Sequence, residues 1–170
     1  RIRIHLRCRK GLEKLVRDEA EEYIAAHGRF RIVHAASRVV ELAPVAPFSL
    51  ADVYQLRCFA TLGFVLGTAR GDAPPARAEA LARLITSPLS RFILSALTEG
   101  PARYRIDFVA AGHQRGAIRQ VASRAYELCP EILNDARRAP WSVDVYPTGN
   151  GLGAELRPRL YPDPRMFYRT

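Results

Sequence analysis

The chain has 170 residues, of which 48% are hydrophobic and 25% are charged. This balance is that of an ordinary globular protein, and it excludes a disordered tail, a collagen-like rod and a disulfide-rich scaffold. The formal net charge of +9 favours a polyanionic partner, with nucleic acid first and a membrane surface second. No apolar run is long enough to span a bilayer and the first residues do not form a signal peptide, so we expect a cytoplasmic protein with no membrane partner.

The positive charge comes almost entirely from arginine, since Lys10 and Lys14 are the only lysines. The guanidinium group is a planar fork that grips phosphate oxygens through two hydrogen bonds and stacks on bases, which lysine cannot do. A GC-rich genome also favours arginine codons over lysine codons. The excess of positive charge is therefore a stronger indication of a polyanionic partner than the preference for arginine is. The three cysteines are isolated and have no metal-ligand spacing, so we expect buried free thiols and no metal site.

The first seventy residues alternate between predicted strands and helices. The expected elements are a strand over 1–8, a helix ending at Gly28, strands over 30–34 and 39–42, a helix starting at Ser49 and a strand over 58–69. The order β-α-β-β-α-β predicts an α/β (α+β) fold with a ferredoxin-like domain at 1–70. The acidic side chains at 18–22 are expected to form a solvated helix face without a catalytic role.

A Gly- and Pro-containing segment, residues 71–76, is predicted to be a linker to a second α/β module at 77–160. The expected elements are helices over 77–85 and 87–97, a strand over 103–109, an amphipathic helix over 116–128, a helical turn over 130–136 and strands over 141–146 and 152–160. Tyr104, Ile106 and Phe108 alternate on one face of their strand, so we expect both aromatic rings in the core. Residues 161–170 are expected to form an extended exit.

Gly149-Asn-Gly-Leu-Gly153 follows a predicted strand, as a dinucleotide or S-adenosylmethionine loop would. Such a loop requires a helix that opens at its last glycine, but the alternating segment after Gly153 predicts a strand. We therefore interpret Asn150-Gly151 as a tight hairpin turn with both residues at positive φ. The nucleophile, phosphate-loop and zinc-protease motifs are also absent from the sequence, so no catalytic, cofactor-binding or metal-binding residue is predicted.

The sequence pattern that most clearly indicates a function is a cluster of basic residues. The loop Gly112–Gly116 joins a strand with outward arginines to a helix whose outward face carries further arginines, and a helix N-terminus offers free N–H groups and a positive dipole to an anion. A solvated helix face explains the same spacing equally well. The candidate RNA-contacting residues are Arg115, Arg119 and Arg124 for phosphates, His113 and Gln114 for sugar or base, and Arg103, Arg137 and Arg138 as outer positioning charges.

Three stretches resemble the THUMP domain, an RNA-binding module of RNA-modifying enzymes. They are YRIDFVAAGHQRGAIRQVASRAY at 104–126, WSVDVY at 141–146 and GAEL at 153–156. The segment GLEKLVRDE at 11–19 is similar to the ferredoxin-like domain that precedes THUMP in methyltransferases. The segment YPDPRMFYR at 161–169 resembles the one that leads into their catalytic domain.

The resemblance implies that this chain binds a structured RNA, with tRNA first, for an S-adenosylmethionine-dependent RNA methyltransferase. The methyltransferase domain and its S-adenosylmethionine would lie elsewhere, in cis or in trans, because the methyltransferase signature is absent from this sequence. We expect the chain itself to be non-catalytic and without a cofactor. A stand-alone THUMP-type adaptor, a protein-interaction or oligomerisation module, and a self-contained methyltransferase using Gly149–Gly153 are the alternatives.

Overall fold

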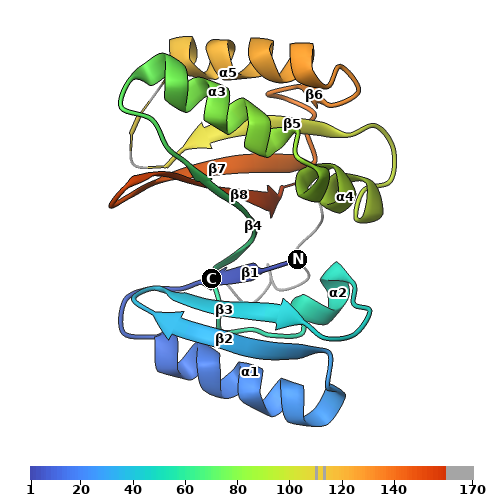
Figure 1. The fold of residues 1–170 in the computed structure, drawn as a ribbon. Helices are drawn as coiled ribbons and strands as arrows, with labels where there is room; N and C mark the ends of the chain where they lie inside the picture. The colour runs from blue at the N-terminus through green and yellow to red at the C-terminus, as the bar shows by residue number, and fades with distance from the viewer. Residues whose placement is uncertain (110, 113, 160–170) are drawn as a thin grey trace. The chain divides into compact units, whose positions relative to one another are not determined.

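The computed structural model describes residues 1–109, 111, 112 and 114–159. It confirms the mixed α/β class, with strands and helices that form two compact units, one up to Phe64 and the other from Val65 onward (Figure 1). Strand β4 (Thr61–Ala69) begins in the first unit and ends in the second. Within the described part of the chain, no helix has the length and apolarity needed to cross a membrane.

The first unit is an antiparallel sheet with one long helix. Its elements are β1 (Ile4–Arg7), α1 (Glu13–His27), β2 (Phe30–Ala36), β3 (Val39–Pro44), α2 (Leu50–Val53) and the first residues of β4. The strand order is β2-β3-β1-β4, and all three pairings are antiparallel. The element order is the predicted one, but α2 is a single turn, and the ferredoxin-like assignment stays a prediction.

The ends of the helices in this unit follow from local chemistry. Gly28 ends α1 in the left-handed region, at φ 64°, and donates its N–H to the Ile24 carbonyl. Ser49 and Asp52 form the capping box that the sequence indicates at the start of α2. Glu19 departs from the predicted solvated face, because its carboxylate accepts backbone N–H groups of Arg57 and Cys58 at 2.8–3.0 Å. It therefore attaches α1 to the segment that precedes β4.

The second unit places helices against a mixed sheet. Its elements are the end of β4, α3 (Pro74–Ile85), α4 (Pro88–Ala96), β5 (Arg103–Phe108), α5 (Arg115–Leu128), β6 (Leu133–Asn134), β7 (Trp141–Thr148) and β8 (Gly151–Pro158). The strand order is β4-β8-β7-β5-β6, with β5 parallel to β6 and β7 and with β7 antiparallel to β8. Helices α3 and α5 pack against each other on one face of this sheet (Figure 1). The first turn of α3 lies inside the predicted linker.

Two local predictions in this unit are wrong. The segment 130–136 is not a helical turn, because it contains β6, whose two residues pair in parallel with the start of β5. The hairpin between β7 and β8 is confirmed, but its two turn residues are Gly149 and Asn150, and neither has a positive φ. Gly151 instead pairs with Thr148 as the first residue of β8. With strand and no helix after the glycines, the cofactor-loop geometry is absent here.

The core of the second unit lies under α3 and α5. Tyr104 and Trp141 are fully buried neighbours on β5 and β7, and burial raises the pKa of Tyr104 to about 12. Phe108, at the end of the same strand, is only half-buried. All three cysteines are free, with Cys8 and Cys129 buried and Cys58 half-buried. Burial raises the pKa of the Cys8 and Cys58 thiols, which favours their protonated form.

Candidate nucleic-acid interface

The structure places the predicted RNA-contacting residues near opposite ends of β5. Arg103 is the first residue of this strand, and β6, which pairs with the same end, leads directly into the loop that carries Arg137 and Arg138. Helix α5 starts after the other end of β5 and brings Gln114, Arg115, Arg119 and Arg124 with it. His113 lies outside the described residues. The candidates therefore form two groups, which we name the α5 group (Gln114, Arg115 and Arg119) and the loop group (Arg137 and Arg138).

The α5 group surrounds the first turns of a 14-residue helix. Gln114 is the N-cap residue, but its side chain donates to the Ala111 carbonyl at 3.1 Å and does not cap the helix. Among the described residues, no side chain caps the first turn of α5, and that turn contains no acidic residue. Arg115 and Arg119 are both exposed and lie one turn apart on the same face. An anion here would meet two guanidinium groups and the positive end of the helix dipole.

A cavity of about 290 Å³ lies between α3 and α5, and Gln114 is the member of the α5 group that lines it. Its apolar wall is formed by half-buried Phe108 with Leu81, Val121 and Leu152, and its polar groups come from Arg77, Gln114 and Gln120. An apolar wall with a few amides and one guanidinium can hold a flat polar ligand by stacking and hydrogen bonding. Sequence analysis missed Arg77 and Gln120, since only the packing of α3 on α5 brings them to Gln114.

Arg124 does not extend the exposed face of Arg115 and Arg119. Its Nε donates to Glu79 Oε2 at 2.6 Å and its Nη2 donates to Glu79 Oε1 at 3.1 Å, which joins α5 to α3. Its Nη1 donates to Glu127 Oε2 at 2.9 Å. These hydrogen bonds, first of all those to Glu79, raise the pKa of the Arg124 guanidinium and hold it in place. The prediction that Arg124 contacts phosphate stays untested, but its guanidinium is already bound to two carboxylates.

The loop group is organised by one carboxylate. Asp135 Oδ1 accepts the backbone N–H groups of Arg137 and Arg138 at 3.1 and 3.0 Å, and Asp135 Oδ2 accepts Nη1 of Arg103 at 3.1 Å. The hydrogen bonds from the loop, with that of Arg138 the strongest, and the charge of Arg103 hold the pKa of Asp135 below its usual value. Arg103 therefore anchors the loop, whereas the side chains of Arg137 and Arg138 are exposed.

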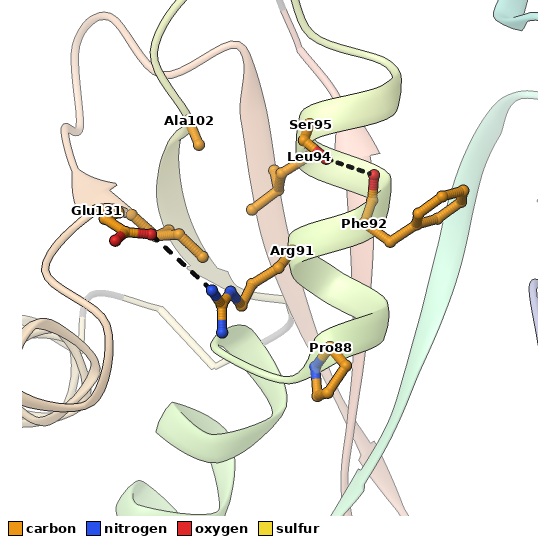
Figure 2. A pocket seen from close by; sticks show the side chains of 8 residues that line it. Pro88, Arg91, Phe92, Leu94, Ser95, Ala102 and Glu131 are labelled. Atoms are coloured by element: carbon orange, nitrogen blue, oxygen red, sulfur yellow. Dashed lines mark hydrogen bonds and ion pairs between the residues drawn. The ribbon is translucent and has the colours of Figure 1, made fainter.

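A second cavity, of about 480 Å³, lies beside α4 at the start of β5 (Figure 2). Arg91 reaches across it to Glu131, with 3.9 Å between Arg91 Nη2 and Glu131 Oε2. Phe92, whose side chain points away from this ion pair in Figure 2, is 58% exposed. Sequence analysis did not single out this region, since its residues come from α4 and from the segments before β5 and β6.

A protein metal site needs a set of several ligand side chains. Within residues 1–109, 111, 112 and 114–159, no group of three or more His, Cys, Asp or Glu side chains could hold a metal ion.

Comparisons with known proteins give structural neighbours only. No protein-family model matches the sequence, and no curated protein matches it. Among solved structures, TrmN from Thermus thermophilus has a TM-score of 0.58 at 18% identity, over 99% of this chain and 48% of that protein. A possible methylase from Clostridium difficile 630 has a TM-score of 0.59 at 10% identity, over 92% of this chain and 41% of that protein.

A third neighbour is described as a 4-thiouridine synthetase–RNA complex with bound ATP, and it matches with a TM-score of 0.55 at 8% identity. The match covers 95% of this chain and 42% of that one. At these identities the similarity shows a shared fold. This chain spans less than half the length of each of these three proteins.

Proposed function

We propose that this chain is the RNA-binding region, ferredoxin-like and THUMP-like, of an RNA-modifying enzyme. The structural neighbours support a role connected with RNA modification, since they include TrmN and a 4-thiouridine synthetase in complex with RNA. The observation that carries the proposal is the start of α5, where two exposed arginines share one face of an uncapped helix N-terminus and Gln114 lines a cavity together with Gln120 and Arg77. This combination suits a polymer of phosphates whose bases can stack and accept hydrogen bonds.

In this proposal the ligand is a structured RNA, and tRNA is the first candidate. Arg115 and Arg119 bind phosphates, Gln114 binds sugar or base, and the loop group makes further phosphate contacts. His113, next to Gln114 in the sequence, keeps its predicted contact to sugar or base. The parent enzyme is an S-adenosylmethionine-dependent methyltransferase, whose catalytic domain and cofactor lie outside this chain.

The test is tRNA binding by this chain as a function of salt, beside an Arg115→Ala/Arg119→Ala variant. Each phosphate contact contributes about 0.7–0.9 to the slope of log K against log salt, so the variant should lose roughly 1.4–1.8 of that slope together with affinity. A control variant, Lys14→Ala/Arg17→Ala, removes the same charge from α1, where both residues are exposed and paired with Asp18 and Glu21. The control should keep its slope.

Two results would contradict the proposal. If the chain does not bind tRNA at low salt, the net charge has no role in RNA recognition. If both variants lose the same slope, binding follows total charge and the α5 group is not the site.

The second candidate is a protein-interaction module, and the observation that favours it is the cavity beside α4 with exposed Phe92 on the same helix. Exposed aromatic side chains are enriched at protein interfaces. A concentration-dependent dimer in analytical ultracentrifugation that a Phe92→Ala variant abolishes, in a chain without RNA affinity, would establish this alternative.

A further inference from the structure

An ion-pair network joins α3 to α5 directly beside the cavity. It runs from Arg83 through Glu79 to Arg124 and Glu127, with N–O distances of 2.9, 2.6 and 2.9 Å. It contains two cations and two anions, so it adds no net charge to the surface. Its central contact, between Glu79 and Arg124, is bidentate and therefore fixes both the distance and the relative orientation of the two groups.

The position of this contact matters because the cavity wall is formed by the same two helices. Glu79 directly follows Ala78, which lines the cavity from α3, and Arg124 lies one helical turn beyond Val121, which lines it from α5. Ala117 is a further lining residue of α5, and like Ala78 on α3 it has a short side chain. Apolar contacts are non-directional, whereas a bidentate ion pair sets the offset of one helix along the other directly.

We infer that the Glu79–Arg124 pair is a positioning element for RNA binding: it holds α3 and α5 at the offset that keeps the cavity open and its polar groups together. Arg77 lies on α3, whereas Gln114 and Gln120 lie on α5 or at its start. A shift between the helices therefore separates groups that must contact one ligand. In this role Arg124 acts through Glu79, and it does not contact RNA. The inference rests on the proposed function.

The decisive variant is Glu79→Gln, because the two possible roles of Arg124 predict opposite signs. If Arg124 binds phosphate, removal of the neighbouring carboxylate frees a cation and tightens tRNA binding. If the pair positions the helices, Glu79→Gln weakens tRNA binding. The expected loss is about tenfold, which corresponds to a typical coupling energy between two residues in contact. Arg124→Lys keeps the charge but loses the planar fork, and should weaken binding similarly while the salt slope stays unchanged. The exchange Glu79→Arg/Arg124→Glu should restore most of the affinity.

Two further measurements separate positioning from a general loss of stability. Binding is measured well below the lowest melting temperature of the variants, so that every protein is folded. Amide hydrogen exchange of the free protein should rise in the first turns of α5 in Glu79→Gln and recover in the exchanged pair. Unchanged affinity with a lower melting temperature, or tighter binding by Glu79→Gln, would overturn the inference.

The outcome for the proposed function is read separately, from the wild-type chain. If the wild type does not bind tRNA, the proposed function fails and the positioning role in RNA binding fails with it. Hydrogen exchange then still shows whether the pair fixes α3 against α5. If the wild type binds tRNA and the exchanged pair does not recover affinity, only the positioning role is wrong.

Discussion

Arg157 on β8 donates through Nε to Asp144 Oδ2 on β7 at 2.6 Å, and this contact neutralises a carboxylate that is only 4% exposed. The register surrounds Asp144 with further acids, since Asp107 pairs with it from β5 and Glu155 pairs with it from β8. Burial acts to lower the pKa of Arg157, but the hydrogen bond and charge of Asp144 outweigh it and raise the pKa. Arg157 therefore allows three neighbouring strands to carry carboxylates side by side.

The first prediction concerns this pair. Arg157→Met keeps an unbranched chain about as long as the aliphatic part of arginine but leaves Asp144 buried without its cation, and should cost about 3 kcal/mol of unfolding free energy, at the lower end for a broken buried pair. Urea unfolding monitored through Trp141 measures it. The double variant Asp144→Asn/Arg157→Met removes the uncompensated charge and should recover part of the loss. A single variant as stable as the wild type would show that the pair contributes nothing.

The second prediction concerns the hairpin between β7 and β8. A Cβ atom at Gly151 would overlap the backbone oxygen of Ala69, and a backbone atom cannot move aside as a flexible side chain does. Gly151→Ala should cost about 1–3 kcal/mol, as overpacking does. The matched control is Gly149→Ala, two residues earlier, where a Cβ atom would meet nothing within 4 Å. Thermal unfolding compares them, and equal melting temperatures would show that the hairpin shifts to accept the methyl group.

The third prediction is a pH dependence. The pKa of Asp135 is lower in the folded protein than in the unfolded chain, so its ionised form adds stability that is complete above the unfolded value of 3.8 and is lost as the pH falls through the folded value. Asp135→Asn should therefore lower the melting temperature at pH 6 to 7, and the gap to the wild type should close below about pH 4. A gap that stays constant down to pH 2.5 would show that the charge of Asp135 is not responsible.

The fourth prediction separates the loop group from the α5 group. Arg137→Ala/Arg138→Ala removes two exposed guanidinium groups and leaves the backbone contacts to Asp135 in place. It should weaken tRNA binding and reduce the salt slope by up to roughly 1.8, at about 0.9 per phosphate contact. Because the two groups lie near opposite ends of β5, this loss should add to that of Arg115→Ala/Arg119→Ala. An unchanged slope would remove the loop group from the proposed interface.

Local chemistry made most elements of the fold predictable. Ser49 with Asp52, Ser87 with Pro88, and Gly28 mark helix ends through contacts over three or four residues, which a sequence displays directly. Strand β6 could not be found in this way, since two residues have no periodicity and exist as a strand only through pairing with β5. The hairpin turn was misplaced by one residue because several glycines compete for it.

The candidate site was less predictable because several of its side chains pair with residues far away in the sequence. Arg115 and Arg119 are exposed, as the helical spacing indicates, but Arg124 was grouped with them because Glu79 lies 45 residues away in the sequence. Arg103 likewise looked like an outward charge, although it is paired with Asp135, 32 residues further on. Sequence periodicity assigns a residue to a helix face, whereas the packing of α3 on α5 decides what that face meets.

The separation of the two basic groups near opposite ends of β5 sets a minimum footprint for an RNA that touches both. A strand of six residues at roughly 3.3 Å each extends about 20 Å. Phosphates advance about 3.4 Å per step along one strand of a duplex, so this distance corresponds to roughly six steps. Oligonucleotides shorter than this can occupy one group only, and affinity should rise sharply once the chain length allows both groups to be reached at once.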